Sequence, residues 1–425
     1  MAGTARVRLG CCAGVINARR GRGDPGSRGD HLAQSIRMIG EGHFPGQAAV
    51  RCPPEVSVVP SARCRPPAAR ETGVTIIMTK TKAFAAQHAG AALAPFSFQR
   101  REPRPHDVAI DISHCGVCHT DVHFVRNDFG MSLYPMVPGH EIVGTVTSVG
   151  NQVTRFKPGD RAAVGCLVDS CRECESCRQG LEQYCQNGFV LTYSSLEKDG
   201  ATVTQGGYSG NIVVDERFVL HVSPKMAPEK VAPLLCAGIT TYSPLQRWKV
   251  GRSHRLGVVG LGGLGHMAVK FGASLGAEVT VLSTSPSKRA DAMRLGAHDF
   301  VLTTDPGEAS RAANRFDFIL DTLSASHDYN GYLAMLKTGG TMVCLGLPPD
   351  PIHVPSAQLV FTGRCIAGSL IGGLPETQEM LNYCAEHGIT ADVEVISIGQ
   401  INEAYERMLR NDVKYRFVID TSSLR

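Results

Sequence analysis

The sequence is poor in aromatic residues and has no long apolar run, and both absences limit what the protein can be. Aromatic side chains make up 6% of the 425 residues, with a single tryptophan, against 46 glycines. That balance favours an α/β protein with many turns over a helical bundle. No apolar stretch reaches the roughly 18 residues that a membrane span needs, so we expect no membrane partner.

A large excess of charge is missing as well. The formal net charge is +4, and charged residues make up 19% of the chain. The basic residues form no dense stripe in the part expected to fold, so nucleic acid is not an expected partner. The length exceeds that of one ordinary domain, which predicts two domains and an extra segment.

Residues 1–77 differ in composition from the rest of the chain. They contain eleven arginines and no lysine against five acidic residues, a net charge of +6, and glycine and proline interrupt them throughout. Three interpretations compete: a disordered extension, a targeting peptide, or an upstream stretch that the cell does not translate. Transit peptides usually begin with an amphipathic helix, which this stretch lacks. We therefore prefer the third interpretation, with Met78 as the first residue.

The remainder changes its pattern once along the chain. Residues 78–222 show period-two strands between turn residues, which indicates a β-rich domain. Strands and helices then alternate up to residue 371, which predicts a parallel sheet with crossover helices. A last helix and strand are expected to close back onto the first domain. The expected domains are 78–237 with 372–425, and 238–371. The expected elements are strands 255–259, 278–283, 316–321, 341–345 and 415–419, and helices 265–276, 288–295 and 376–387.

Fifteen cysteines without a secretory signal indicate metal binding in a reducing compartment rather than disulfides. Four of them, Cys171, Cys174, Cys177 and Cys185, have the spacing C-x2-C-x2-C-x7-C. Zinc accepts four tetrahedral thiolates, and a closed site of four thiolates is structural. Iron–sulfur clusters use related spacings, but the usual surroundings of an electron-transfer protein are missing, and the other alternative is four free thiols.

A glycine-rich turn predicts a dinucleotide site. Gly260, Gly262 and Gly265 follow the strand 255–259 with GxGxxG spacing and open a helix, with Gly263 and Leu264 between them. In that context one glycine allows the tight turn, one lets the backbone approach the pyrophosphate, and one allows close packing of helix on strand. The helix N-terminus adds amide donors and the positive end of its dipole.

The end of the next expected strand predicts the choice of cofactor. An acid at this position holds the ribose 2′-hydroxyl of NAD, but the strand ends at Ser283 and the run 283–289 reads STSPSKR. Because this run contains no carboxylate, it would not repel a 2′-phosphate, and the forked guanidinium of an arginine binds phosphate well. We therefore predict that the cofactor is NADP(H). The alternative is that Lys288 and Arg289 are only the exposed start of a helix. The expected phosphate-binding residues are Ser283, Thr284, Ser285, Lys288 and Arg289.

Four further residues are unremarkable singly: Cys118 in GVCHTD, His140 and Glu141 in PGHE, and Cys236 in LLCAG. A lone cysteine is usually a small buried hydrophobe. Together with the motifs above, the chain resembles the zinc-containing medium-chain dehydrogenase/reductase family, in its cinnamyl-alcohol-dehydrogenase-like branch. The resemblance covers about residues 78–421. It rests on CGVCHTDVH, YPMVPGHEIVG, LEQYC, TQGGY, PLLCAGITTYSPL, GLGGLGHMAVK and GSLIGG, in this order.

The resemblance implies a GroES-like catalytic domain and a Rossmann domain with a doubly wound parallel sheet, and two zinc ions per chain. It implies a catalytic zinc held by Cys118, His140 and Cys236, the two-cysteine, one-histidine set already known for alcohol dehydrogenases, with an open fourth position. Such a zinc acts as a Lewis acid on a substrate oxygen. Glu141 would lie beside the metal. Asp121 would orient His140. The alternative is that Asp121 is only a turn or helix-cap residue.

The resemblance also implies a proton path and a substrate pocket. Thr120 would hydrogen-bond the substrate oxygen, His123 would shuttle the proton near neutral pH, and His119 would lie near the cofactor pyrophosphate. Both histidines could instead be simply exposed. Plant cinnamyl enzymes carry a large aromatic side chain at the position of Val190, which favours a broad reductase here. The expected pocket residues, each of which could be ordinary core, are Phe129, Met131, Phe189, Val190, Leu370 and Ile371.

The predicted function is therefore that of a cytoplasmic, NADP-dependent zinc alcohol dehydrogenase for aliphatic and aromatic primary alcohols and aldehydes. By analogy with the family we expect a homodimer formed through edge strands around 341–347. Two alternatives remain. One is a zinc dehydrogenase for polyols or glutathione adducts, which would carry an acid at Ser283. The other is a non-enzymatic, zinc-stabilised binding protein, which would have lost a zinc ligand or a glycine.

Overall fold

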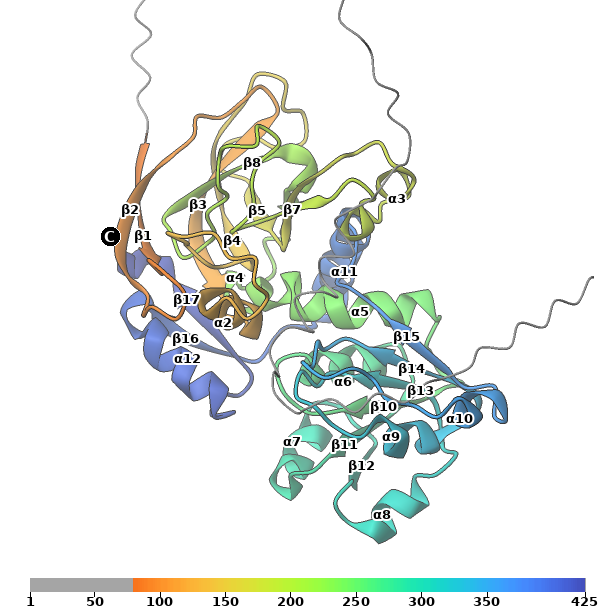
Figure 1. Cartoon of the computed structure of the whole chain (residues 1–425). Helices are drawn as coiled ribbons and strands as arrows, with labels where there is room; N and C mark the ends of the chain where they lie inside the picture. Colours follow the sequence, from red (N-terminus) through yellow and green to blue (C-terminus); the bar gives the residue numbers. More distant parts are fainter. Residues whose placement is uncertain (1–78, 425) are drawn as a thin grey trace, which may run out of the picture. The chain divides into compact units, whose positions relative to one another are not determined.

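The computed structural model of the chain describes residues 79–424 (Figure 1). The expectations about residues 1–77 and a start at Met78 lie outside the described residues. Within them, one β-rich sheet and one parallel sheet with crossover helices form, together with two small two-stranded sheets. The predicted fold class is confirmed. No helix of this part has the length and apolar character needed to cross a bilayer.

The larger sheet of the described part has seven strands in the order β16-β17-β3-β4-β5-β9, with β8 beside β3. Its last strand, β17, pairs antiparallel with β3, so the end of the chain closes back onto the first sheet as predicted. The strands outside the parallel sheet are β1 (Thr79–Ala85), β2 (Ala94–Arg100), β3 (Asp107–Gly116), β4 (Ile142–Val149), β5 (Arg161–Val164), β6 (Leu167–Ser170), β7 (Phe189–Leu191), β8 (Asn211–Asp215), β9 (Leu220–His221), β16 (Val393–Ser397) and β17 (Arg416–Asp420).

Short helices accompany this sheet. The most regular is α12, which buries Ile401, Ala404, Tyr405 and Met408, the spacing of one helical face. The helices are α2 (His119–Arg126), α3 (Glu175–Arg178), α4 (Pro228–Val231), α11 (Leu374–His387) and α12 (Ile401–Leu409), with 3-10 turns η1 (Glu182–Tyr184), η2 (Glu216–Phe218), η3 (Ala232–Leu235), η5 (Ile398–Gln400) and η6 (Thr421–Leu424).

The parallel sheet has the strand order β12-β11-β10-β13-β14-β15, which is the doubly wound order of dinucleotide-binding folds. Its central strand buries four consecutive apolar or glycine positions, as a strand covered on both faces does. The elements are β10 (Arg255–Val259), β11 (Glu278–Ser283), β12 (Asp299–Leu302), β13 (Phe316–Asp321), β14 (Leu336–Cys344), β15 (Cys365–Gly368), α5 (Ala237–Arg247), α6 (Gly265–Ser274), η4 (Pro286–Lys288), α7 (Arg289–Arg294), α8 (Pro306–Arg311), α9 (Tyr329–Met335) and α10 (Ser356–Val360).

One expectation about this sheet is wrong. Residues 341–347 were expected at its edge, but β14 lies between β13 and β15, and the edge strand on this side is β15. The reason is that β15 has only four residues, CIAG, and shows no strand period that the sequence alone could reveal. Its strand character comes from pairing with β14, residue by residue from Thr341 to Cys344.

One of the apolar clusters of the described part spans both sheets. This cluster includes Val143 of β4, Val258 of β10 and, between them in the chain, Ile239 and Tyr242 of α5. Packing therefore gives no boundary between the two parts, and the domain limits at 237/238 and 371/372 stay a prediction.

Candidate metal and cofactor site

Four side chains from distant parts of the chain meet in the interior. One ligand atom of each of Cys118, His140, Glu141 and Cys236 lies within 4.8 Å of the others, and all four residues are buried. The two sulfur atoms are 3.9 Å apart. Zinc bound to two sulfurs at about 2.3 Å separates them by about 3.8 Å in a tetrahedron, so the donor set fits zinc.

Two helices begin at this cluster. Cys118 is the N-cap residue of α2, and Cys236 is the N-cap residue of α5. A helix N-terminus favours negative charge, which suits thiolate ligands. The hydrogen bond with Cys236 lowers the pKa of Cys118 well below its usual range, against the effect of burial. The same bond raises the pKa of Cys236 well above its usual range, so without a metal the pair favours a thiolate at Cys118 only.

A buried carboxylate holds these residues in place. Asp121 is fully buried and accepts hydrogen bonds from the backbone amides of Cys118 at 2.9 Å and Gly139 at 3.1 Å. The hydroxyl of Tyr208 donates to it at 3.1 Å, and Nδ1 of His140 lies at 3.1 Å. With Nδ1 bonded to Asp121, Nε2 of His140 is left for a metal, the usual arrangement of a ligating histidine.

Glu141 has one paired and one unpaired oxygen. Its Oε1 accepts a hydrogen bond from Nη2 of Arg416, whereas the buried Oε2 has no partner among the described residues. Burial raises the pKa of Glu141 to about 8, although the Arg416 guanidinium opposes this. An unpartnered carboxylate oxygen within a cluster of thiols is a group that a cation would satisfy.

Sequence reasoning missed Arg416. Its side chain is 5% exposed in β17, and a Cβ atom added to Gly263 would lie 2.9 Å from its Nη1. One guanidinium thus touches both the metal cluster and the glycine-rich turn. The available signal was an arginine within the apolar strand RFVID, because a buried arginine needs an acidic partner.

The residues expected in the proton path lie on α2. Oγ1 of Thr120 is 3.6 Å from Sγ of Cys118, so this hydroxyl lies beside the cluster. Nδ1 of His123 is 2.8 Å from Oδ2 of Asp128, and both side chains are partly exposed. His119 is the first residue of α2 and is exposed. Of the three, the structure brings only Thr120 against the metal cluster.

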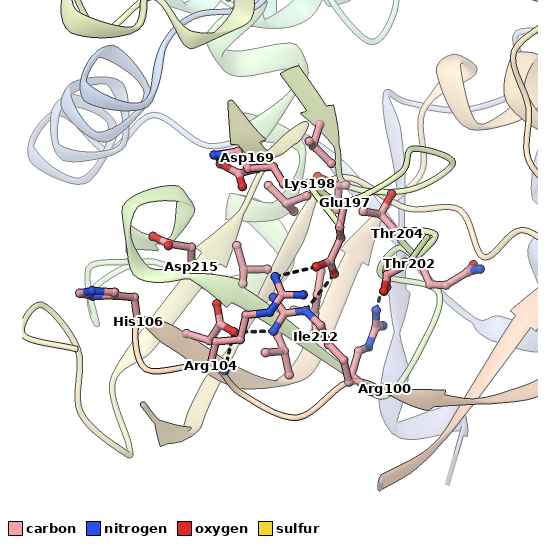
Figure 2. A pocket seen from close by; sticks show the side chains of 18 of the residues that line it. Arg100, Arg104, His106, Asp169, Glu197, Lys198, Thr202, Thr204, Ile212 and Asp215 are labelled. Carbon is pink, nitrogen blue, oxygen red and sulfur yellow. Dashed lines mark hydrogen bonds and ion pairs between the residues drawn. The ribbon is translucent and has the colours of Figure 1, made fainter. Parts of the chain in front are cut away.

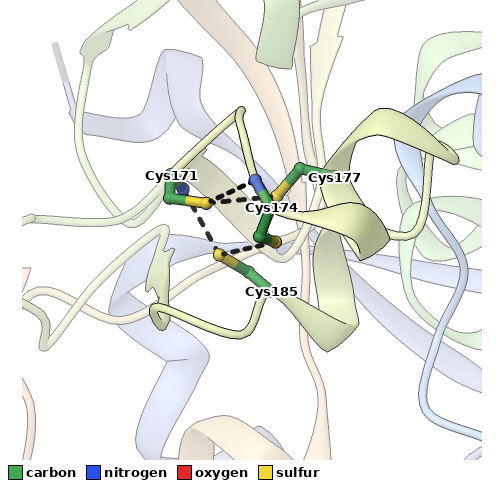
Figure 3. A group of neighbouring side chains, drawn as sticks. All are labelled: Cys171, Cys174, Cys177 and Cys185. Atoms are coloured by element: carbon green, nitrogen blue, oxygen red, sulfur yellow. Dashed lines mark hydrogen bonds between the residues drawn. The ribbon is translucent and has the colours of Figure 1, made fainter.

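The second group of cysteines forms a closed cluster (Figure 3). Sulfur atoms of Cys171 and Cys177 are 3.8 Å apart, and those of Cys174 and Cys185 are 4.0 Å apart. The backbone amides of Glu173 and Cys174 lower the pKa of Cys171 to about 6. These distances fit a tetrahedral zinc with four thiolates and no open position. All eleven cysteines of the described part are free of disulfides.

The glycine-rich turn has the geometry that its motif predicts. Gly260 has a φ of +84°, and a Cβ on Gly265 would lie 2.1 Å from the carbonyl oxygen of Gly260. A Cβ on Gly262 would meet nothing within 4 Å, so this side of the turn is open to a ligand. Leu264 is the N-cap residue of α6. The turn therefore offers backbone amides at a helix N-terminus, where a pyrophosphate binds.

The segment after β11 contains the expected phosphate-binding residues, whose role stays a prediction. Ser283 ends the strand, and its hydroxyl accepts from the amide of Ser285 at 3.2 Å. Nη2 of Arg289 donates to both oxygens of Glu308, at 2.9 and 3.1 Å. The guanidinium of Arg289 is thus paired with the carboxylate of Glu308, nineteen positions further along the chain. Lys288 has no ion pair within the described residues, and Thr284 is exposed.

The residues expected in the substrate pocket divide into two groups. Ile371 lines a small cavity of about 20 Å³ together with Cys166 and Leu235, next to Cys236. Met131 and Leu370 are exposed. The ring of Phe129 lies 5.4 Å from that of His123. The role of these four residues in a substrate pocket stays a prediction.

Val190 does not join them. Adjacent residues of a strand point to opposite faces, so Phe189 and Val190 of β7 cannot both face one channel. Val190 lines a separate cavity of about 360 Å³ (Figure 2). That cavity is surrounded by ion pairs, among them Arg101 with Asp107 and with Glu197. The place of Val190 in the substrate pocket stays a prediction.

Comparisons with known proteins agree with this geometry. A family model of the alcohol dehydrogenase GroES-like domain matches residues 104–224, and one of zinc-binding dehydrogenases matches residues 263–386. The NADP-dependent alcohol dehydrogenase C of Mycobacterium bovis is 53% identical over 347 residues, which cover 82% of this chain and 100% of the relative. The chain belongs to the zinc-dependent alcohol dehydrogenase family.

Two further relatives place this alcohol dehydrogenase within the family. The aldehyde reductase YahK of Escherichia coli is 52% identical over 347 residues, covering 81% of this chain and 99% of the relative. A solved structure, the cinnamyl alcohol dehydrogenase of Helicobacter pylori complexed with NADP(H), matches with a TM-score of 0.77 and 40% identity, over 81% of this chain and 99% of that one. The predicted cinnamyl-alcohol-dehydrogenase-like branch is confirmed.

The role of Asp121 in holding the metal ligands can be tested by zinc analysis. We expect the purified alcohol dehydrogenase to contain about two zinc ions per chain, one for each cluster. Asp121→Asn should weaken zinc binding at Cys118, His140 and Cys236 by roughly 10- to 100-fold, so that dialysis against a mild chelator leaves about one zinc. Asp305→Asn, which removes a carboxylate cap from α8 far along the chain, should keep both. Equal zinc retention in the two variants would contradict the assignment.

Proposed function

We propose that this alcohol dehydrogenase interconverts primary alcohols and aldehydes, aliphatic and aromatic, with NADP(H) as the hydride carrier. The observation that carries the proposal is the buried cluster of Cys118, His140 and Cys236, joined to the glycine-rich turn by Arg416. Cluster and turn together form a metal centre beside a dinucleotide site. The names of the relatives, an NADP-dependent alcohol dehydrogenase and an aldehyde reductase, support both the cofactor and the substrate class.

The proposed roles of the residues follow from their positions. Zinc supplies a Lewis acid and NADPH supplies the hydride when both are bound. Thr120, whose hydroxyl lies beside Cys118, holds the substrate oxygen and exchanges a proton with it. His123 receives or delivers that proton at the surface, with its ring oriented by Asp128. The pH profile of His123→Ala tests this path, and an unchanged turnover and profile would refute it.

Selectivity for NADP(H) is proposed to rest on the segment after β11. The strand ends in Ser283 rather than an acid, and Lys288 is free to meet a 2′-phosphate because no carboxylate of the described part pairs with it. Ser283, Thr284 and Ser285 would add hydroxyl donors. Arg289, bound to Glu308, is proposed to shape the segment rather than to bind the phosphate. A polyol dehydrogenase with NAD would need an acid where Ser283 stands.

The assembly and location of the enzyme are proposed on more general grounds. We propose that residues 78–237 with 372–425 hold the metals and that residues 238–371 hold the cofactor. A second copy of the chain is proposed to cover the edge strand β15, because the exposed apolar residues Leu347, Val360 and Phe361 lie in the segment that leads into it. The free thiols of the described cysteines support a reducing location such as the cytoplasm.

Oxidation of NADPH with a panel of aldehydes tests the function. Turnover with both butanal and cinnamaldehyde is expected, with a higher kcat/KM for NADPH than for NADH. Higher kcat/KM with NADH would refute the cofactor but keep the reaction class. If no aldehyde were reduced by a protein that holds about two zinc ions, the substrate class would be wrong.

The proposed phosphate contact can be measured with a matched pair of neighbouring variants. Lys288→Ala removes a charge-assisted bond to the 2′-phosphate, so KM for NADPH should rise about 10- to 100-fold while KM for NADH changes little. Arg289→Ala should leave KM for NADPH within about threefold, because this arginine pairs with Glu308. The opposite ranking of the two variants would show that Arg289 turns to the phosphate on binding.

Dimer formation can be tested at Phe361, which is 85% exposed in the single chain. Phe361→Asp places a charge on the apolar patch and should convert a dimer into a monomer in solution. Leu409→Asp, an exposed apolar position of α12, is the control and should remain dimeric. Light scattering that finds a monomer for the unaltered chain, or a dimer for Phe361→Asp, would contradict the proposed interface.

A further inference from the structure

The loop that carries the four clustered cysteines touches the segment that returns the chain from β15 to α11. We name these the cysteine loop (residues 171–185) and the crossover segment (residues 369–373). The hydroxyl oxygen of Tyr184 accepts a hydrogen bond from the backbone amide of Leu370 at 3.0 Å. Oε2 of Glu182 accepts one from the amide of Leu374, the first residue of α11, at 2.9 Å.

A third contact joins the two backbones directly. A Cβ on Gly373 would lie 1.6 Å from the carbonyl oxygen of Gly180, so no side chain fits between them. The ring of Pro375 also lies against Gly180. In Figure 1, α3 belongs to the cysteine loop and α11 directly follows the crossover segment. Residues 180, 182 and 184 thus contact the crossover segment and the start of α11 in turn. All three lie between Cys177 and Cys185, two of the clustered cysteines, so a bound metal would fix both ends of this stretch.

Glu182 completes the beginning of α11. The first amides of a helix have no partner within the helix and need an acceptor from elsewhere. The N-cap residue of α11 is Gly373, which has no side chain to provide one. The Glu182 carboxylate supplies that acceptor, and its negative charge lies at the positive end of the helix. A distant loop therefore does for α11 what a local Ser or Asp does for other helices.

The crossover segment contains a strained residue. Ile371 has a φ of +35°, a region that β-branched residues rarely adopt. Such a conformation persists only where its surroundings determine it, and here the two bonded amides, Leu370 and Leu374, lie on either side of it. Ile371 shares its small cavity with Leu235, the neighbour of Cys236. The residue with the strained backbone thus lines the same cavity as the residue that precedes a metal ligand in the chain.

We propose that Tyr184 and Glu182 are positioning residues, which set the substrate wall at Leu370 and Ile371 from the cysteine loop. The inference rests on the proposed aldehyde reduction for the identity of that wall. Its consequence is that the cysteine cluster, which has no open position for chemistry, still influences which aldehydes fit. Releasing one of the two bonds lets the crossover segment relax from the conformation at Ile371, and a bulky aldehyde then loses its fit before a small one does.

The test uses the full chain with its zinc. Tyr184→Phe keeps the ring and removes the acceptor for the Leu370 amide. Glu182→Ala removes the cap of α11, whereas Glu182→Gln retains a side-chain oxygen that can accept the same bond and should rescue it. Tyr383→Phe is the matched control, because this tyrosine of α11 loses one hydroxyl bond, to Ser274, without touching the crossover segment.

Two readouts are compared with the unaltered chain. Hydrogen exchange of the peptide that covers residues 370–374 should quicken about fivefold or more in Tyr184→Phe and Glu182→Ala, and stay unchanged in Glu182→Gln and Tyr383→Phe. KM for cinnamaldehyde should rise about fivefold in the first two variants, while KM for butanal and both kcat values stay within about twofold. Zinc content should be the same in all five proteins.

The outcomes separate this inference from the proposed function. Unchanged exchange in Tyr184→Phe and Glu182→Ala would overturn the positioning role. Faster exchange with an equal loss for both aldehydes, or a loss of zinc in Tyr184→Phe, would overturn it too, since the effect would then be general. A protein that reduces no aldehyde at all refutes the proposed function, while hydrogen exchange still decides whether the loop holds the crossover segment.

Discussion

The site depends on one buried carboxylate. Asp121 receives the amides of Cys118 and Gly139, the ring of His140 and the hydroxyl of Tyr208. A buried charge without such partners costs several kcal/mol, so the chain is held in the conformation in which all four donors reach it. That conformation also brings two metal ligands from separate segments together. The same carboxylate therefore positions both of these ligands.

A buried ion pair extends this arrangement to the cofactor turn. Arg416 binds Glu141 beside the metal ligands and lies against Gly263 in the turn. The last strand of the large sheet supplies this arginine, because β17 pairs with β3 and so lies next to the metal cluster. One side chain thus neutralises charge at the metal centre and approaches the dinucleotide site. Closing the C-terminal strand onto the first sheet is what makes the two sites adjacent.

The cysteine loop approaches the same region from the other direction. Its residues Glu182 and Tyr184 bind amides of the segment that leads from the parallel sheet to α11. Ile371, between those amides, lines a small cavity together with Leu235, the residue before Cys236. A loop without an open metal position can still shape the wall of a pocket, because rigidity is transmitted through hydrogen bonds to strained residues.

Local patterns carried most of what the sequence alone determined. The cysteine spacing, the GxGxxG turn after a strand and the missing acid at Ser283 are each contained in a short stretch, so the fold class and the four-cysteine cluster could be predicted from local patterns. The cluster of Cys118, His140 and Cys236 is spread along the chain and is predicted only through the resemblance to the family. The contacts of Arg416, Arg289 and Val190 could not be predicted. Each depends on a partner or a strand face set by pairing between distant segments: Glu141 for Arg416, Glu308 for Arg289, and the β6 partner strand for Val190. Only the tertiary structure decides these, because side-chain direction follows from register, and register follows from long-range packing.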